Sequence, residues 1–475
     1  MSADESDIES FDVVVVGVGS AGHRAAAAAH EEGARVLAVD GSEAAGRELG
    51  GLCILRGCMP TKTLLETAHR LHDIRDAERF GIKVGEPELD FAAHMARMRS
   101  LVARFQRAKV GGLTGADWEL AQGSVRFEDP HTLVIDGSRR VRARTIVLST
   151  GSKVRPLPVR AEAGVTILDS DDMFQLEAPP ESIAVLGTGA VGIEFAQWLA
   201  RIGSRVTLIG RSPLLHRLDI EAGKELALAL GEEMSLHVPV KTAKILATEN
   251  GRARVEMVES DGTEHSVAVE CVLNATGRVP NFDGLGLDEA GITVGVIDTG
   301  DRERGGTFQS ETPHVFVAGD ATGETLILHE ANLEGKVAGA NAARLARGES
   351  ELKRYDRGIP PAEVIFSDPV AASCGRTLAQ CEEDGLEVRD AVKRFPQQGR
   401  GIVTGTKYGF IRLIATRDTG RIVGCQILGP HAEDLIQIPI AVMAFKGTAA
   451  DMVRMPWYHP TLAEAFIEVA RPLAV

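Results

Sequence analysis

The sequence has few cysteines, no long apolar run and no excess of basic residues, and each absence excludes a class of protein. Six cysteines in 475 residues are too few for a disulfide-stabilised scaffold. No apolar run is long enough to cross a bilayer, and residues 1–10 lack the basic and apolar segments of a secretory signal. The 52 Lys and Arg against 67 Asp and Glu give a net charge of −15, which argues against binding to nucleic acid or an anionic membrane. We therefore expect a cytoplasmic protein without nucleic-acid or membrane partners.

A glycine-rich turn lies between two apolar runs near the N-terminus. The first run is Val13–Val16, as in a buried parallel strand, and the second run ends at Asp40. Between them stand a helix-like, alanine-rich segment and the glycines of a G-x-G-x-x-G motif, Gly17, Gly19 and Gly22. In a dinucleotide site, such glycines admit a pyrophosphate to a helix N-terminus and the acid binds a ribose hydroxyl. The alternative is a glycine-rich turn that binds nothing.

The same arrangement recurs in the middle of the chain, with one difference. Its glycines are Gly187, Gly189 and Gly192. The spacing of the first copy would place the acid at residue 210, but Gly210 stands there, followed by Arg211 and then Arg217. Because arginines attract a 2′-phosphate and an acid would repel it, we expect the first site to bind FAD or NAD and the second to prefer NADPH. The retained third glycine is typical of NAD sites, so NADH use is also possible. Alternatively, the two arginines are solvated surface charges.

Cys53 and Cys58 form a close pair, and three interpretations are open for it. Two dinucleotide sites suggest electron transfer between cofactors, and a disulfide would serve as a further two-electron acceptor. Cys58 precedes Met59-Pro60, and proline favours the first turn of a helix, whose N-terminus lowers the pKa of a thiol. A metal clip would need a second Cys/His pair at zinc-like spacing, which the sequence lacks. Inert cysteines are the third interpretation. The other four cysteines are expected to be buried small side chains: Cys271, Cys374, Cys381 and Cys425.

A proton carrier for thiolate chemistry is expected near the C-terminus. Histidine suits proton transfer at neutral pH. His459 is followed by Pro460 and by Glu464, whose carboxylate would orient the imidazole. A histidine without a catalytic role is the alternative interpretation.

Six motifs together resemble the flavin-dependent pyridine nucleotide-disulfide oxidoreductases, a family that includes dihydrolipoamide dehydrogenase, glutathione reductase and mercuric reductase. The resemblance covers nearly the whole chain, and the motifs occur in the order of the family. They are GVGSAG with Asp40, GLCILRGCMPTK around the cysteine pair, GTGAVGIEFA, ATGRVPN (275–281), VFVAGDATG (315–323) and HPTLAE (459–464).

The resemblance implies cofactors and a role for each site residue. It implies FAD, together with NADPH or NADH. Cys58 would be the charge-transfer thiol beside the flavin, and Cys53 the thiol that attacks substrate. Lys62 would lie near the flavin and pair with Glu194, and His459 with Glu464 would serve the other subunit of a homodimer. Further cofactor-binding positions implied by the motifs are Gly51, Thr150, Gly151, Gly277, Arg278, Gly319 and Asp320.

The expected fold class is α/β, with two Rossmann-like dinucleotide-binding domains and a C-terminal α+β dimerisation domain. Residues 1–153 and 284–352 are predicted to form the FAD-binding domain, 154–283 the NAD(P)-binding domain, and 353–475 the interface domain.

The predicted function is that of an FAD-dependent NAD(P)H:disulfide oxidoreductase, most similar to dihydrolipoamide dehydrogenase. Its substrate would be a small disulfide or a lipoyl group. The missing acid at Gly210 weakens that assignment, and Arg211 with Arg217 matches the spacing in glutathione reductase. A mercuric reductase is the other enzymatic alternative, although the sequence ends RPLAV without a terminal cysteine pair. A flavoprotein that serves mainly as a binding subunit for a lipoyl-carrying partner is the alternative outside the enzymes.

Overall fold

The computed structural model describes residues 8–42, 46, 48–301, 305–355 and 362–475. The chain forms two compact units, each of which combines separate stretches of sequence. Unit 1 comprises Met1–Pro60, Arg97–Arg155 and Arg278–Arg357, and unit 2 comprises Thr61–Ala96, Pro156–Gly277 and Gly358–Val475. The three-domain division given above stays a prediction. No helix in the described ranges is both long enough and apolar enough to cross a membrane.

Unit 1 is built on a sheet whose central strand leads into the first glycine-rich turn. In the described part of the unit, the strand order is β3-β2-β1-β6-β5-β4, and β17 pairs with β6. The pairs of β1 with β2 and β6 are parallel, and β4, β5 and β6 pair in antiparallel fashion. The strands are β1 (Glu9–Val16), β2 (Val36–Asp40), β3 (Glu119–Gln122), β4 (Val125–Asp129), β5 (Thr132–Ile135), β6 (Arg139–Leu148) and β17 (Val315–Val317).

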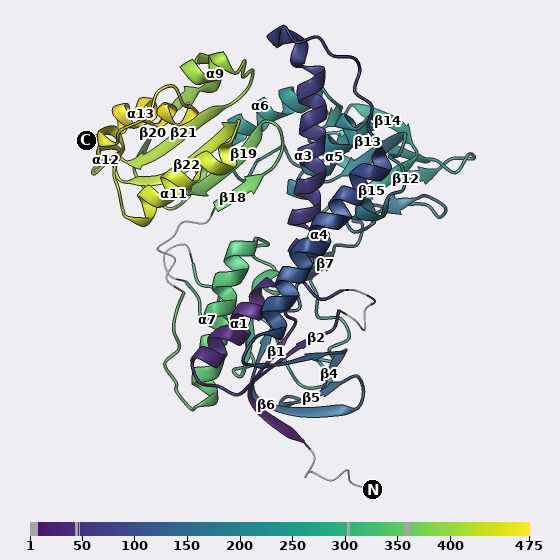
Figure 1. Cartoon of the computed structure of the whole chain (residues 1–475), viewed down its shortest axis with the longest axis vertical. Coiled ribbons are helices and arrows are strands. Elements are labelled where there is room, and N and C mark those ends of the chain that lie inside the picture. Colours follow the sequence, from purple (N-terminus) through teal and green to yellow (C-terminus); the bar gives the residue numbers. More distant parts are fainter. Residues whose placement is uncertain (1–7, 43–45, 47, 302–304, 356–361) are drawn as a thin grey trace. The chain divides into compact units, whose positions relative to one another are not determined.

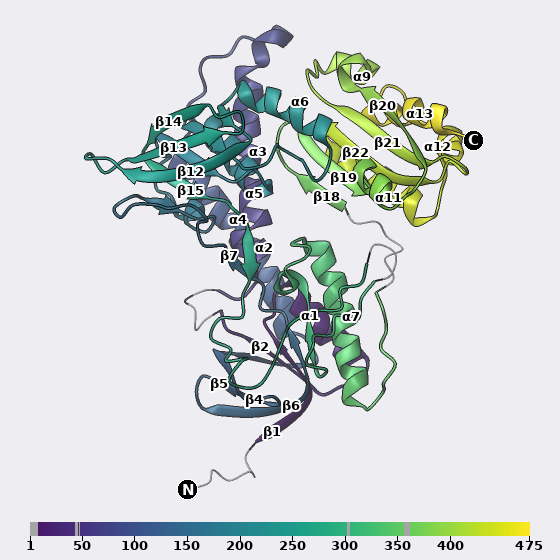
Figure 2. The ribbon, with the colours of Figure 1, turned by 180° about the vertical axis from the view of Figure 1, so that it is seen from behind.

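Both faces of this sheet are covered by apolar side chains. Val13 and Val15 face one cluster and Val14 and Val16 the other, because successive side chains of a strand point to opposite faces. The first cluster includes alanines of α1 (Ser20–Glu31) and α7 (Leu328–Ala346), two helices that lie side by side (Figures 1 and 2). Burial on both faces explains why β1 reads as an uninterrupted apolar run. Unit 1 also contains α2 (Leu52–Arg56), β7 (Ser152–Val154), β16 (Arg278–Pro280) and a 3₁₀ turn (Gly319–Thr322).

The central part of unit 2 has a parallel sheet and a smaller antiparallel sheet. The parallel order is β11-β10-β9-β15-β8, and the antiparallel order is β12-β13-β14. An apolar layer that includes Ile245, Val255 and Met257 joins the two sheets. The elements are β8 (Ile167–Leu168), a 3₁₀ turn (Asp172–Gln175), β9 (Ser182–Leu186), α5 (Ala190–Arg201), β10 (Arg205–Ile209), α6 (Ile220–Gly231), β11 (Ser235–His237), β12 (Val240–Ala247), β13 (Ala253–Glu259), β14 (Glu264–Val269) and β15 (Cys271–Asn274).

The C-terminal part of unit 2 is an antiparallel sheet in the order β18-β19-β22-β21-β20, with short helices. Two of the three inner strands, β21 and β22, are buried along their whole length. The strands are β18 (Ala362–Ile365), β19 (Val370–Gly375), β20 (Val388–Arg394), β21 (Phe410–Thr416) and β22 (Ile422–Gly429). The helices are α8 (Leu378–Glu383), α9 (Gly399–Val403), α10 (Ala432–Leu435), α11 (Gln437–Ala444), α12 (Ala449–Arg454) and α13 (Ala465–Ala470), with 3₁₀ turns at Phe395–Gln397, Leu462–Glu464 and Arg471–Leu473.

Two long helices, α3 (Cys58–Arg75) and α4 (Phe91–Thr114), contribute residues to both units. A 3₁₀ turn (Ala77–Phe80) follows α3. The helix predicted over about residues 61–80 is present, but it begins earlier, at Cys58, and ends earlier, at Arg75. The prediction that the other four cysteines are buried is also confirmed.

Candidate active site and cofactor sites

The first glycine-rich turn brings the start of α1 against the end of β1. A Cβ atom on Gly22 would lie 1.8 Å from the Gly17 carbonyl oxygen, so only glycine permits this approach. The residue before α1 is Gly19, which has no side chain to cap the helix. The backbone N–H groups of the first helical turn are therefore available to an anion, as a diphosphate requires.

Asp40 ends the neighbouring strand β2 and is buried beside this turn. Its Oδ2 accepts a hydrogen bond from the Val18 amide, and its Oδ1 accepts one from the Ser42 amide, both at 2.9 Å. A carboxylate has about four lone-pair sites, so these two bonds orient Asp40 and leave capacity for a ribose hydroxyl. Asp40 is the register partner of Gln122 on β3. Gln122 lines an open cavity of about 600 Å³, together with Glu48, Leu49, Gln106, Val110, Thr114 and Leu120.

Two further positions that the motifs predicted to bind a cofactor, Asp320 and Arg278, are connected through Ser152, which was not predicted. The hydroxyl of Ser152 donates to Asp320 Oδ2 at 2.7 Å, and Arg278 Nε donates to the same hydroxyl at 2.8 Å. The Thr150 hydroxyl is buried and has no hydrogen-bond partner among the described residues. An orphaned buried hydroxyl is expected where a ligand supplies the missing partner. The uncapped helix, the oriented acid and this hydroxyl together fit FAD.

Lys109 on α4 was not predicted from the sequence. Its Nζ lies 2.7 Å from Nδ1 of His23 on α1 and 3.4 Å from the carbonyl oxygen of Gly19. Burial, followed by the nearby charge of Arg24, lowers the pKa of Lys109 to about 8. Burial and the charge of Lys109 lower the pKa of His23 to about 4, so His23 is neutral at pH 7. Lys109 thus supplies a cation at the predicted diphosphate site.

The second turn repeats the close approach of the first. A Cβ atom on Gly192 would lie 1.9 Å from the Gly187 carbonyl oxygen, and α5 begins after Gly189 without a side-chain cap. A Cβ atom on Gly210 would lie 2.3 Å from Cγ2 of Thr188, the residue between the first two glycines. The Thr188 side chain therefore occupies the space beside Gly210. Arg211 and Arg217 are exposed, so both guanidinium groups are accessible to a nucleotide.

The cysteine pair lies at the junction of two helices. Cys53 is on α2 and Cys58 is the first residue of α3, whose 18 residues give a full helix dipole at its N-terminus. Cys53 is partly exposed and Cys58 is exposed, whereas Cys271 is buried. Burial, followed by the charge of Glu270, raises the pKa of Cys271 to about 12. Of these cysteines, only the pair therefore has the exposure that reactive thiols need.

Lys62 lies one turn after Cys58 on α3 and forms an ion pair with Glu194 of α5, as the resemblance implied. Lys62 Nζ is 2.7 Å from Oε2 and 2.9 Å from Oε1 of Glu194. The Glu194 side chain is only 4% exposed, and its Oε1 also accepts a hydrogen bond from the Phe366 amide at 3.0 Å. Three hydrogen bonds thus fix this carboxylate, and the carboxylate in turn fixes the lysine.

His459 and Glu464 form a second pair in the C-terminal part of unit 2. His459 Nδ1 is 2.9 Å from Glu464 Oε1, and the Thr461 amide donates to Oε2 of the same carboxylate at 3.0 Å. These two contacts, the Thr461 bond first, lower the pKa of Glu464. The imidazole is 78% exposed. Because Nδ1 is engaged, Nε2 is the ring nitrogen left to exchange protons with a partner.

Comparison with known proteins identifies the family. Residues 11–344 match the pyridine nucleotide-disulphide oxidoreductases, and residues 361–470 match the dimerisation domain of the same family. The chain belongs to this family. A dihydrolipoyl dehydrogenase of Thermus scotoductus is 31% identical over 473 residues, which cover 98% of each chain. One from Geobacillus stearothermophilus is 31% identical over 470 residues, 97% of this chain and 95% of the relative.

A solved structure shows the same fold. The HOCl-induced flavoprotein disulfide reductase RclA from Escherichia coli has a TM-score of 0.78 and 22% identity, over 97% of this chain and 99% of that chain. The predicted α/β fold class is confirmed, as are the family, the use of FAD with NAD(P)H and the oxidoreductase activity that they entail. The roles of individual site residues stay predictions.

Proposed function

We propose that this oxidoreductase exchanges electrons between NAD(P)H and a disulfide, with a dihydrolipoyl group as its thiol substrate. The observation that carries the proposal is the oriented His459–Glu464 pair, because an imidazole held through Nδ1 is suited to deprotonate a substrate thiol. Full-length relatives named dihydrolipoyl dehydrogenase, at about 30% identity, support the choice of substrate.

The proposed reaction uses both cysteines. His459 takes a proton from one substrate thiol, and the thiolate attacks Sγ of Cys53. The Cys53–Cys58 bond breaks, and Cys58 leaves as a thiolate that the N-terminus of α3 stabilises. The second substrate thiol then displaces Cys53, whose sulfur takes up the proton of that thiol, so the substrate leaves as a disulfide and the cysteine pair has gained two electrons. FAD, when bound, carries electron pairs between the cysteine pair and the nicotinamide.

We further propose that the enzyme is a homodimer and prefers NADPH. The dimerisation-type domain supports the first point, and in the dimer the histidine of each chain would serve the cysteine pair of the other chain. Gly210 supports the second point, because it leaves no carboxylate to repel a 2′-phosphate where an NAD-type site has one. Arg211 and Arg217 then supply accessible positive charge. The third glycine of the turn, Gly192, is consistent with residual use of NADH.

An anaerobic titration with NADPH tests the role of the cysteine pair. Two electrons should produce a long-wavelength absorbance band from a thiolate beside the flavin. Cys58→Ser should lose this band and retain FAD, whereas Cys53→Ser should keep the band and lose turnover. Cys271→Ala is the control, because burial holds that thiol protonated and no role is proposed for it. Normal turnover in both Cys53→Ser and Cys58→Ser would refute the proposal.

Steady-state assays test the substrate. Oxidation of dihydrolipoamide by NADP⁺ or NAD⁺ should give the highest kcat/KM, and reduction of lipoamide by NADPH or NADH the next highest. Glutathione disulfide and mercuric ion serve as competing substrates. A higher kcat/KM for either of them would replace the dihydrolipoyl assignment and leave the oxidoreductase chemistry of the cysteine pair intact.

A further inference from the structure

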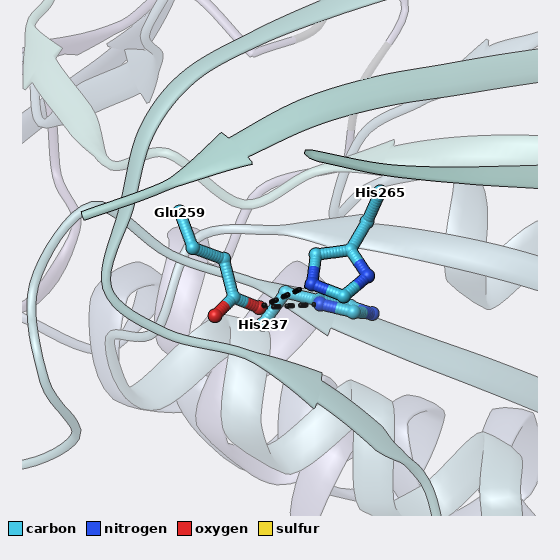
Figure 3. A group of neighbouring side chains, drawn as sticks. All are labelled: His237, Glu259 and His265. Carbon is cyan, nitrogen blue, oxygen red and sulfur yellow. Dashed lines mark hydrogen bonds and ion pairs between the residues drawn. The ribbon is translucent and has the colours of Figure 1, made fainter. Parts of the chain in front are cut away.

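Three side chains of the types that ligate metals meet in unit 2, and none of them is among the residues proposed for the redox reaction. They are His237, Glu259 and His265, and Figure 3 shows both imidazoles directed at the same carboxylate. His237 Nδ1 lies 2.8 Å from Glu259 Oε1, and His265 Nε2 lies 3.3 Å from the same oxygen. The three donor atoms all lie within 4.8 Å of one another.

The fold brings these residues together from three strands. His237 ends β11, Glu259 ends β13 and His265 is the second residue of β14. His265 is the register partner of Met257, which lies two residues before Glu259 and therefore on the same face of β13. That face is the one that packs on the parallel sheet through Met257. The cluster thus lies at the rim of the apolar layer between the two sheets, where polar side chains take the place of apolar ones.

The spacing between the donor atoms of His265 and Glu259 is that of two ligands in a tetrahedral metal site. Zinc binds histidine nitrogen and carboxylate oxygen at about 2.0–2.2 Å, so two ligands of one ion lie about 3.4 Å apart. The distance of 3.3 Å between His265 and Glu259 already has this value. The carboxylate needs to withdraw from His237 by only roughly half an ångström to admit an ion. Strands rather than loops carry all three donors, which limits the movement of their backbone when an ion binds.

The donor set selects the class of metal. Two imidazoles and one carboxylate suit Zn²⁺ and similar transition-metal ions, whereas Mg²⁺ and Ca²⁺ prefer oxygen ligands. The side chains of His237, Glu259 and His265 are 19%, 28% and 36% exposed, respectively. An ion can therefore enter from solvent and keep a water molecule in a fourth position. We propose that His237, Glu259 and His265 form a binding site for one Zn²⁺ ion at the rim between β11 and the β12-β13-β14 sheet.

A purely structural role is the competing explanation. The same contacts could serve only to join β11 to β13 by a histidine–carboxylate hydrogen bond. The two explanations differ in what added zinc does, because only a binding site raises the thermal midpoint with zinc concentration. They also differ in the effect of Glu259→Gln, which keeps a hydrogen-bond acceptor and removes the anionic metal ligand.

The experiment is a ZnCl₂ titration of the FAD-loaded, full-length protein in competition with a chromophoric chelator. The cysteine pair is kept as a disulfide, because reduced thiols would bind zinc themselves. One equivalent of zinc per chain should bind in the presence of millimolar Mg²⁺. Glu259→Gln and His265→Gln should each weaken binding at least tenfold, whereas Glu264→Gln, an exposed neighbour on β14, should leave it unchanged. Co²⁺ in place of Zn²⁺ should give visible ligand-field bands without sulfur charge-transfer bands.

The controls and the remaining outcomes of the titration either support or overturn the zinc site. FAD content and thermal melting in the absence of metal show whether each variant is folded, and two ligand variants are used so that one unstable variant does not prevent the test. A Cys53→Ser, Cys58→Ser double variant that still binds one equivalent supports the site. Loss of binding in that double variant, wild-type affinity in both ligand variants, or no zinc bound to the oxidised protein would overturn the proposal.

Discussion

Replacing Glu194 with glutamine should release Lys62 from the position in which the buried carboxylate holds it. Glutamine preserves the shape and can still accept the hydrogen bond from Phe366, but it removes the charge that holds the lysine. At 2.7 Å and an effective dielectric constant near 20, the direct attraction between the two charges is about 6 kcal/mol, most of which desolvation offsets. Removing one partner of a fully buried pair costs about 3–5 kcal/mol. Because Lys62 is 30% exposed, water screens its charge, and we expect a loss of about 2–3 kcal/mol.

The effect should appear in two assays at matched FAD content. The thermal midpoint should fall by several degrees, and stopped-flow reduction of the flavin by NADPH should slow at least tenfold because the lysine is no longer positioned. Glu66→Gln is the matched control, since it breaks an exposed ion pair with Arg70 on the same helix and should leave the thermal midpoint nearly unchanged. If Glu194→Gln behaves like Glu66→Gln in both assays, the reasoning is refuted.

Three further predictions concern the proton carrier, the nucleotide and the flavin. His459→Gln should slow the thiol–disulfide half-reaction about a hundredfold and leave flavin reduction unchanged, and equal slowing of both half-reactions would contradict its role. Arg211→Ala should reduce the ratio of kcat/KM for NADPH to that for NADH about tenfold, because a charge-assisted bond contributes roughly 1.5–3 kcal/mol. Arg205→Ala serves as the control, and a tenfold preference of the wild type for NADH would refute the prediction. Because the pKa of Lys109 is lowered to about 8, its positive charge is lost as pH rises through that value. FAD binding to the apoprotein, followed by fluorescence quenching, should therefore weaken from pH 7 to 9 in the wild type but not in Lys109→Met.

The parts of the site that depend on residues close together in the sequence could be predicted from the sequence. The glycine spacing of each turn, the buried run of β1 and the presence of a helix after the cysteine pair all follow from local constraints on backbone and burial, although the helix begins at Cys58 and not at about residue 61. The contacts that tune the site could not be predicted in this way. Lys109 and His23 are 86 positions apart, and no local pattern marks a lysine that will be buried beside a particular helix. His237 and His265 meet at one carboxylate only because two sheets pack together.

The two glycine-rich turns show why a missing acid does not by itself define a nucleotide site. In the first turn, the backbone amide of Val18 holds the Asp40 carboxylate. The corresponding residue of the second turn is Thr188, whose side chain fills the space beside Gly210 and whose hydroxyl lies 3.4 Å from the carbonyl oxygen of Ser212. An acid at residue 210 would have to turn Thr188 away and break that contact. The middle residue of the turn and the residue after the second strand are therefore sterically coupled, and a substitution at residue 210 that tests nucleotide preference has to allow for the side chain at residue 188.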